Sequence, residues 1–566
     1  MTPTNVQAAS PEVTQEVATL ERLVSTRRRT AILAVGAFFA YFLLLQIPLL
    51  YLGGAFTAEL SGYPDEPAHH ITSLLVDQCV RQGCWTSPLT FADRLYTYYP
   101  KVAFGHWPPL LYIVQGGWTL LFGSSKIAVI LLQAVFASLC AVAIFLSGQR
   151  ITSPMLAFLA GGMFLGIPVV QQYNGMVMAE SLLCLLMLAS AISFGIYAST
   201  GRGLYAVSFA IFAALSILTK GTGWALAMVP PIVIVLTRSW HLILKRWTWI
   251  AAILVLLLCT PWQLYTMGLA AHGWESDSPN LAYTVKALQQ FALLVPRLCG
   301  WALTLGALVG IWTRVVARFS SRGVSGEAAA LVGLFLTAYL FHSLVPAGVE
   351  DRKIMLGFPA LAIFGVIGMH DLASKAIASL RLGSALSVPV AATLSIAAAS
   401  ANFWVPQKPS YGFRDAAKVV AQSPVKTAAL VSSERDGEGL LISEVAFLQP
   451  DPKQFVLRAS KMFSEANWGG NISRPKIRST EELESVLASV PVHYIVLDTR
   501  PGYWGPLRHH RLLLDLVSRS PEWRKAAQYG SVQHPVYLYE RIGPVEPATK
   551  ISIDMTSRIG RSISVP

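Results

Sequence analysis

The sequence is poor in charge. Only 13% of its 566 residues are Asp, Glu, Lys or Arg, against about 25% in a typical soluble domain, while 54% are hydrophobic and the mean hydropathy is +0.51. This excludes an ordinary soluble enzyme and predicts a polytopic membrane protein. The net charge of +13 does not indicate nucleic-acid binding, because Lys and Arg gather at the ends of apolar runs, where they orient spans and meet anionic lipid.

The sequence also lacks a metal-ligand pattern of cysteines and an apolar segment near its start. Residues 1–29 are mostly polar, so we expect a flexible cytoplasmic tail and not a signal peptide. Cys79 and Cys84 share a polar loop and can pair if that loop faces an oxidising compartment. The other four of the six cysteines lie in or beside apolar runs, at positions 140, 184, 259 and 299.

Apolar runs and basic clusters predict the topology. Three arginines at 27–29 precede a run from about 31 to 53, which is long enough to cross roughly 30 Å of hydrocarbon. Basic clusters at 238–246 and 314–322 mark the cytoplasmic side. The number of membrane crossings places both clusters on that side only if the short apolar piece at 108–123 does not cross and is instead interfacial or re-entrant. The prediction is about 11 spans, with the amino terminus inside and the carboxyl terminus outside. The ten later spans are expected at about 126–148, 154–172, 178–199, 204–219, 222–238, 247–264, 298–313, 328–346, 354–372 and 384–404.

The composition divides the chain into domains. A transmembrane domain is predicted over 30–404, with an outer-face loop at 54–107, and a soluble domain follows at 405–545. Alternating helical and strand patterns within residues 405–545 predict that this soluble part is a small extracytoplasmic α/β domain. Residues 546–566 are expected to be a loose tail. The patterns place helices at 411–422, 479–490 and 511–523 and strands at 426–433 and 492–498.

The outer-face loop opens with the sequence GYPDEPAHH. Asp65 and Glu66 lie between two prolines, which hold the backbone extended or turned, so we expect at least one carboxylate to face outward. The alternative is a solvated loop that caps a helix, with one of these carboxylates in the first turn. His69 and His70 add metal-ligand chemistry, although adjacent histidines often serve only as polar loop groups.

Two ionisable residues interrupt apolar runs. Glu180 lies at the outer end of a predicted span, where burial of its charge is costly without a partner, so it is a candidate functional residue. It either contacts substrate or pairs with a cation such as Lys220, which lies in the Gly-rich break TKGTG. A structural ion pair or a snorkelling lysine is the alternative for Lys220.

Five motifs occur in order: the Asp-Glu pair, HWPPLLYIVQGGWTLLFG, LSILTKGTGWALAMVPP, TPWQLY and EDRKIMLGFPALAIF. Over roughly residues 30–375 their order and spacing resemble the GT-C glycosyltransferases, above all family 39, which includes the protein O-mannosyltransferases and the lipid A aminoarabinose transferase. The resemblance implies transfer of a polyprenyl-phosphate-linked sugar to a hydroxyl of a glycan, lipid or protein acceptor at the outer face of a bacterial inner membrane. It implies no required cofactor; a divalent metal is the less favoured alternative.

The resemblance also assigns roles. Asp65 stands where the family has its catalytic aspartate, and a single displacement with this one base inverts the anomeric centre. Glu66 beside it is expected to orient Asp65 or the acceptor. Arg352 and Lys353, at the outer end of a span, are expected to stabilise the charge on the leaving phosphate.

One position departs from the related aminoarabinose transferase. That enzyme has a lysine before the Pro-containing motif, whereas this chain has His106, which can donate a hydrogen bond to phosphate but brings no fixed charge. The alternative for His106 is an interfacial neighbour of Trp107. The remaining residues predicted to bind substrate are Glu180, where the family usually has Asp, and Lys220, Tyr99 and His69.

Two other classes of protein compete with this interpretation. A lipid transporter or flippase predicts polar residues near the bilayer midplane and paired halves with discontinuous spans, but here the charges gather at the outer surface and no halves repeat visibly. A non-catalytic scaffold leaves the five ordered motifs unexplained. A single substrate site requires Asp65, Glu180 and Arg352 to lie within about 10 to 15 Å of one another.

Overall fold

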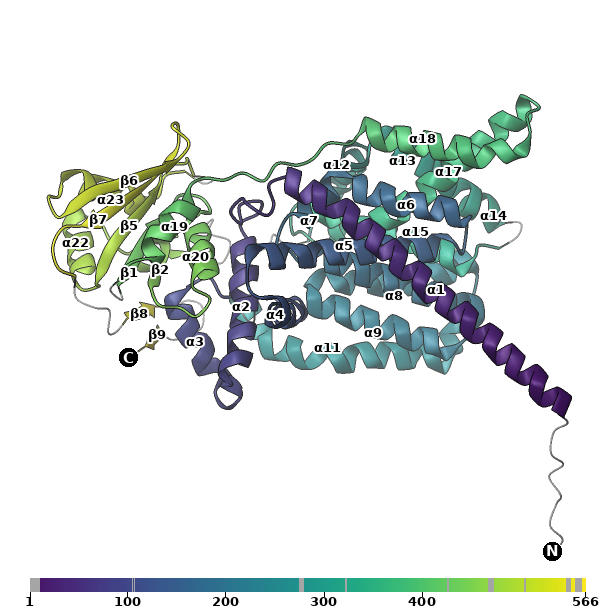
Figure 1. Cartoon of the computed structure of the whole chain (residues 1–566), viewed down its shortest axis with the longest axis horizontal. Helices are drawn as coiled ribbons and strands as arrows, with labels where there is room; N and C mark the ends of the chain where they lie inside the picture. Colours follow the sequence, from purple (N-terminus) through teal and green to yellow (C-terminus); the bar gives the residue numbers. More distant parts are fainter. Residues whose placement is uncertain are drawn as a thin grey trace, which may run out of the picture.

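The computed structural model consists of a long helical bundle with a small sheet domain at one end (Figure 1). We call the end at which α2 (Glu66–Gln82) packs against α20 (Gly437–Leu448) of the sheet domain the domain end, and the opposite end the far end. The structure describes residues 11–103, 105, 107–273, 279–320, 323–424, 427–466, 473–502, 505–545, 551–554 and 562–565.

Most of the predicted spans are single helices. Within the described ranges, eight helices are long and apolar enough to cross a membrane, and all eight were predicted. The predicted span at 154–172 is instead a pair bent by 67°, and those at 204–219 and 222–238 are shorter apolar helices. The helices of the bundle are α1 (Pro11–Leu52), α5 (Lys126–Gly148), α6 (Pro154–Gly166), α7 (Pro168–Asn174), α8 (Glu180–Thr200), α9 (Gly203–Thr219), η2 (Gly221–Met228), α10 (Val229–Thr237), α11 (Arg246–Gly273), α12 (Leu281–Cys299), α13 (Trp301–Ile311), α15 (Gly326–Leu344), α17 (Phe358–Ser379) and α18 (Ser387–Ala401).

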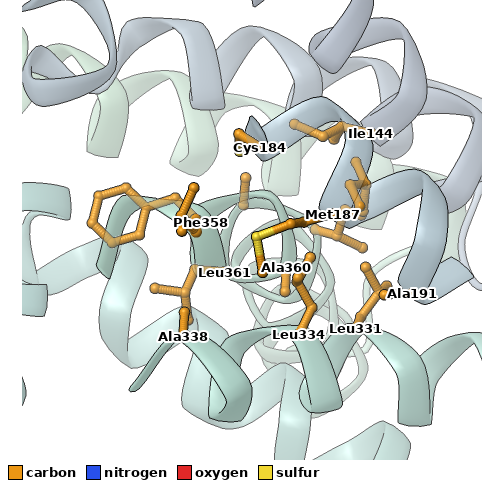
Figure 2. Packing of buried hydrophobic residues seen from close by; sticks show 14 of the residues in the cluster. Ile144, Cys184, Met187, Ala191, Leu331, Leu334, Ala338, Phe358, Ala360 and Leu361 are labelled. Atoms are coloured by element: carbon orange, nitrogen blue, oxygen red, sulfur yellow. The ribbon is translucent and has the colours of Figure 1, made fainter. Parts of the chain in front are cut away.

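The centre of the bundle is packed with small and aliphatic side chains. Figure 2 shows side chains of α5, α8, α15 and α17 meeting there, among them Ile144, Met187, Leu334 and Leu361. In contrast, α1, α11 and α18 expose apolar side chains along their outer faces. Because water would make such exposure costly, these faces are suited to contact lipid.

The predicted outer-face loop is folded. It contains α2 and α3 (Pro88–Tyr98), and α4 (Leu110–Phe122) follows. Figure 1 shows α4 nearly end-on, whereas α5, α8 and α9 run lengthwise across the view, so α4 lies across the direction of the spans. This orientation agrees with the prediction that residues 108–123 do not cross the membrane. A disulfide joins Cys79 to Cys84, the pairing that the sequence allowed.

Two predicted tails differ from the structure. From Pro11 the amino-terminal segment is helical and continues into the first span as α1, because adding residues to an existing helix is far less costly than nucleating one. At the other end, β8 (Ile551–Asp554) and β9 (Ser562–Val565) form an antiparallel pair that buries Ile553 and Ile563. Their alternation of apolar and polar residues is the two-residue period of a strand, which the composition of the tail obscured.

The sheet domain confirms the predicted α/β class. Its five-stranded sheet has the order β2-β1-β5-β7-β6, in which β2, β1 and β5 are parallel and β7 and β6 antiparallel. All five segments predicted from the sequence are present as α19, α22, α23, β1 and β5. The elements are α19 (Phe413–Ala421), β1 (Ala428–Ser432), α20 (Gly437–Leu448), β2 (Phe455–Arg458), α22 (Thr480–Ala488), β5 (Val492–Asp498), α23 (Arg508–Arg519), β6 (Trp523–Gly530) and β7 (Pro535–Arg541), with a separate small pair, β3 (Ser464–Ala466) and β4 (Ser473–Pro475).

A buried carboxylate attaches this domain to the bundle. Glu59 is fully buried and accepts hydrogen bonds from the backbone amides of Tyr411, Gly412 and Arg414 at 2.8–3.1 Å. These amides lie at the amino terminus of α19, where the helix dipole favours a negative charge. Glu59 therefore fixes the start of the sheet domain against the segment that leads to α2.

We expect Glu59→Ala to loosen this junction. Each buried amide left without an acceptor costs about 1–3 kcal/mol, so the variant should show faster proteolysis between residues 403 and 411 and a lower Tm in detergent. The control is Asp415→Ala, because the Asp415 side chain is 54% exposed and, among the described residues, forms an ion pair only with the surface residue Lys418. Equal proteolysis of both variants and the wild type would show that Glu59 does not hold the domain.

Candidate active site

Asp65 occupies the turn that starts α2. It is the N-cap residue, but its side chain makes no capping hydrogen bond, although capping was the alternative interpretation of this loop. Pro67 in the first turn has no amide hydrogen to cap, and its fixed φ suits a helix start. The Asp65 side chain is 30% exposed and is therefore available for other contacts.

Arg352 brings the predicted carboxylates together. Its guanidinium lies 3.4 Å from Asp65 Oδ2 and 3.7 Å from Glu180 Oε1, and Nε donates to Glu350 Oε2 at 2.6 Å. It also lies over the ring of Tyr63, whose hydroxyl donates to the same Glu350 oxygen. Asp65, Glu180 and Arg352 thus meet at one point, as a single site requires.

The charges at this point determine the state of Glu350. Burial by itself would raise the pKa of Glu350, but Arg352 and Lys353 outweigh it and lower that pKa to about 2. Glu350 is therefore ionised at any physiological pH. With Asp65 and Glu180, it gives the guanidinium three carboxylate neighbours, so a ligand anion that approaches Arg352 must compete with them.

Glu180 is the first residue of α8, and Lys220 is the residue between α9 and η2. The extended backbone of Lys220 interrupts the helices at the predicted Gly-rich break and places Nζ 2.5 Å from Glu180 Oε1. The predicted pairing is confirmed. The second oxygen of Glu180, Oε2, is buried and accepts no hydrogen bond from any described residue. Such an atom is a free acceptor inside the site.

Glu66 is turned away from this point. It is fully buried, its Oε1 accepts from the amides of Gly62 and Tyr63, and its Oε2 accepts from the amide of Val177 and from Lys408 Nζ at 2.7 Å. Its oxygens are occupied, so it does not face a substrate. Glu66 instead ties three segments together and so positions its neighbour Asp65.

His69 lies one helical turn after Asp65. Its ring stacks on Trp107 with centroids 4.3 Å apart, and Nδ1 shares a hydrogen bond of 2.9 Å with the Tyr112 hydroxyl. Burial lowers the pKa of His69 to about 4 despite the nearby Asp65 charge, so the ring is neutral at pH 7. No described group of three or more His, Cys, Asp and Glu side chains is arranged to hold a metal ion.

Two other predicted site residues, Lys353 and Tyr99, differ in their placement, and a third lies outside the described residues. Lys353 donates to the carbonyls of Ala347 and Gly348 and to Glu350, so its three N–H groups hold the preceding loop and leave none for a phosphate. Tyr99, expected at the substrate, is fully buried in the core of the sheet domain, where its hydroxyl donates to the Gln449 carbonyl. His106 lies outside the described residues.

Lys101 was missed by the sequence analysis. Its side chain carries no hydrogen bond or ion pair within the described ranges, and it lies against Gly439 of α20 and near Pro67. Burial and Arg458 lower the pKa of Lys101 to about 8, while Asp65 and two acidic residues of the sheet domain oppose the change. The lysine therefore stands between the sheet domain and Asp65. Its position five residues before His106 was the available clue.

The Glu66–Lys408 pair allows a test of this frame. Both side chains are almost fully buried, so Lys408→Met should leave an unpaired carboxylate and destabilise the protein by about 3–5 kcal/mol. The double variant Lys408→Met/Glu66→Gln should recover part of that loss, measured as Tm in detergent. Lys418→Met, which removes a half-exposed lysine, is the control and should change Tm little. A double variant less stable than the sum of the single variants would contradict the assignment.

The sequence and the fold were compared with known proteins. Residues 106–265 match the family model described as dolichyl-phosphate-mannose-protein mannosyltransferase. No curated protein matches the chain.

Solved structures share its fold. ArnT from Cupriavidus metallidurans bound to undecaprenyl phosphate is 15% identical, with a TM-score of 0.56 over 89% of this chain and 99% of ArnT. The apo state of ArnT is 14% identical, with a TM-score of 0.58 over 89% and 98%. The Archaeoglobus fulgidus oligosaccharyltransferase tethered with an acceptor peptide is 12% identical, with a TM-score of 0.51 over 82% and 69%. As its ordered motifs predicted, the chain has the fold of the GT-C superfamily of membrane glycosyltransferases.

Proposed function

We propose that the protein transfers a sugar from a polyprenyl-phosphate donor to an acceptor hydroxyl, with inversion at the anomeric carbon and Asp65 as the general base. The observation that carries the proposal is the meeting of Asp65, Glu180 and Arg352, which come from three separate segments, around one guanidinium. A base, a buried acceptor and a fixed cation at one point are the groups that such a transfer needs.

Asp65 is suited to take the acceptor proton. Its Oδ1 accepts no hydrogen bond from the described part of the chain, and the side chain is partly exposed. As the acceptor oxygen forms its bond to the anomeric carbon, its proton passes to Asp65, and the bond between that carbon and the phosphate oxygen breaks. The phosphate leaves with the electron pair. One base and one displacement invert the centre.

Two cations are available for the leaving phosphate. Arg352 keeps its charge at all relevant pH values, and it reaches the site from the short helix α16 (Asp351–Ile354) before α17. Lys101 approaches from the side of the sheet domain and has no ion-pair partner among the described residues. We assign to Lys101 the positive charge that the related aminoarabinose transferase carries as a lysine before its Pro-containing motif, where this chain has His106.

Glu180 is suited to orient the sugar. Its Oε1 is neutralised by Lys220 and Arg352, while its buried Oε2 remains a free acceptor for a sugar hydroxyl. A hydrogen bond from a hydroxyl to a charged acceptor contributes about 1.5–3 kcal/mol. Positioning by this bond would hold the anomeric carbon in line with the acceptor oxygen.

The comparisons and the sequence support the substrate class and the orientation. ArnT, which shares the fold over nearly its whole length, was solved with undecaprenyl phosphate, and this is the chemistry we propose for the donor here. The basic residues at the far end and the disulfide near the domain end favour an orientation with the domain end outside, and the family resemblance implies a bacterial inner membrane.

The direct test uses purified protein, labelled polyprenyl-phosphate sugars and membrane extract, and follows which product acquires label. We expect the wild type to transfer label and Asp65→Asn to lose about 100-fold to 10,000-fold in rate, the range for loss of a general base. Asp415→Asn, a matched change at an exposed carboxylate, should transfer at the wild-type rate.

A lower rate counts only if Asp65→Asn keeps the wild-type Tm. Retained transfer by this variant would refute the role of Asp65. If the wild type forms no labelled product but moves labelled lipid between the leaflets of liposomes, the flippase alternative is correct and the proposed transfer is wrong.

Lys101 makes the reaction sensitive to pH. Because its pKa of about 8 lies below that of an ordinary lysine, Lys101 loses its charge as the pH rises through 8, and donor binding should weaken there. We expect the donor KM of the wild type to rise about tenfold between pH 7 and 9, because a charged hydrogen bond is lost. Lys101→Arg should abolish this rise, and Lys101→Met should show the high KM at both pH values.

The control for this series is Lys453→Met at an exposed position of the sheet domain, which should keep the wild-type profile. If Lys101→Arg shows the same rise in KM as the wild type, another group titrates and Lys101 does not bind the phosphate.

A further inference from the structure

A second cationic site lies at the far end of the bundle. An open pocket of about 460 Å³ is lined there by three arginines, Arg150, Arg314 and Arg318, and by the turn that leads into α15. The arginines come from the segment after α5 and from the region η4 (Trp312–Val316) to α14 (Ala317–Phe319). Figure 1 shows α14 at the end of the bundle opposite α2 and the sheet domain.

The acidic residues nearby do not neutralise the pocket. Arg314 pairs with Asp371 at 3.1 Å, and Arg150 makes only a loose pair with Glu327 at 3.8 Å. Arg318 is exposed, and within the described ranges its side chain has neither an ion-pair nor a hydrogen-bond partner. Three guanidinium groups therefore face two carboxylates, and the excess positive charge is open to a ligand.

The pocket wall adds donors suited to an oxyanion. Thr152 and Ser325 contribute hydroxyl groups, and Ser325 caps the 19-residue helix α15 by accepting from the amide of Ala328. The positive end of that helix dipole therefore lies at the pocket and favours an anion. Guanidinium groups are matched to the oxygens of a phosphate, which they can bind in pairs.

The depth of the pocket in the membrane indicates the source of that phosphate. The 19 residues of α15 lead from the pocket to the loop that precedes Glu350, a length of about 28 Å. This is close to the thickness of the hydrocarbon core. The pocket therefore lies at the level of the lipid headgroups in the leaflet opposite the Asp65 site.

Exposed apolar side chains lie close in sequence to the residues that line the pocket. Met155, Trp312 and Phe319 lie within three residues of its lining residues and are 52%, 62% and 36% exposed. Exposed apolar side chains beside a basic pocket are more stable in contact with acyl chains than in contact with water. We propose that this pocket binds the phosphate of an anionic phospholipid, a ligand separate from the proposed donor and acceptor.

The test measures retained phosphatidylglycerol by native mass spectrometry, together with Tm. The full chain is placed in nanodiscs of phosphatidylcholine with or without phosphatidylglycerol. We expect the wild type to retain phosphatidylglycerol and to gain in Tm. Arg318→Gln should weaken retention about fivefold, and Arg150→Gln/Arg318→Gln about 25-fold, because each basic residue near an anionic surface contributes about that factor. Arg314 is left unchanged, since its loss would leave Asp371 without its cation.

The control is Arg202→Gln, a change at an exposed arginine that follows α8 at the same end but lies outside the pocket; it should keep the wild-type retention. If Arg202→Gln and the pocket variants lose phosphatidylglycerol equally, only the general surface charge acts and the proposal is wrong. A third arm adds inorganic phosphate to phosphatidylcholine nanodiscs. A Tm gain equal to that from phosphatidylglycerol would show a site for free phosphate and would overturn the lipid assignment.

Discussion

The Arg352 guanidinium is the interaction on which the candidate site depends. Asp65, Glu180 and Glu350 come from three segments, and without a cation between them their charges would repel one another. An unpaired carboxylate as deeply buried as Glu180 would cost several kcal/mol. Lys220, like Arg352, offsets the charge of Glu180 by pairing with its Oε1, and Oε2 of Glu180 stays free. These charges balance one another without substrate. The arrangement also leaves two groups available to a substrate, the acceptor Oε2 of Glu180 and the partly exposed carboxylate of Asp65.

A second buried pair keeps Asp65 in place. Glu66 and Lys408 are 342 residues apart in sequence and meet in the interior. Lys408 belongs to the linker that enters the sheet domain, so the geometry of the site depends on where that domain sits. The same domain buries Tyr99 and contacts Lys101 through α20. The sheet domain is thus part of the frame of the site, whether or not it also contacts the acceptor.

The sequence predicted those site residues whose charge would be costly to bury without a partner. Glu180 and Lys220 were found because a charge in an apolar run needs a partner, and the predicted topology placed Arg352 and Asp65 on the same outer face. The partners of Glu66 and Tyr99 could not be predicted, because Lys408 and Gln449 are distant in sequence and no local pattern marks them. Length likewise identified eight spans, while the bent pair α6–α7 and the two short helices depend on packing.

The bundle separates two kinds of electrostatic environment. At the domain end, cations and carboxylates are nearly balanced and largely buried, so a ligand must exchange partners with Arg352 in order to bind. At the far end, arginines are in excess and partly exposed, so an anion can bind without displacing a carboxylate. The helix α15 joins the two, with its positive dipole end at the arginines and its carboxyl end leading to Glu350. A headgroup held at one end of this helix would therefore help to fix the depth at which the other end presents Arg352.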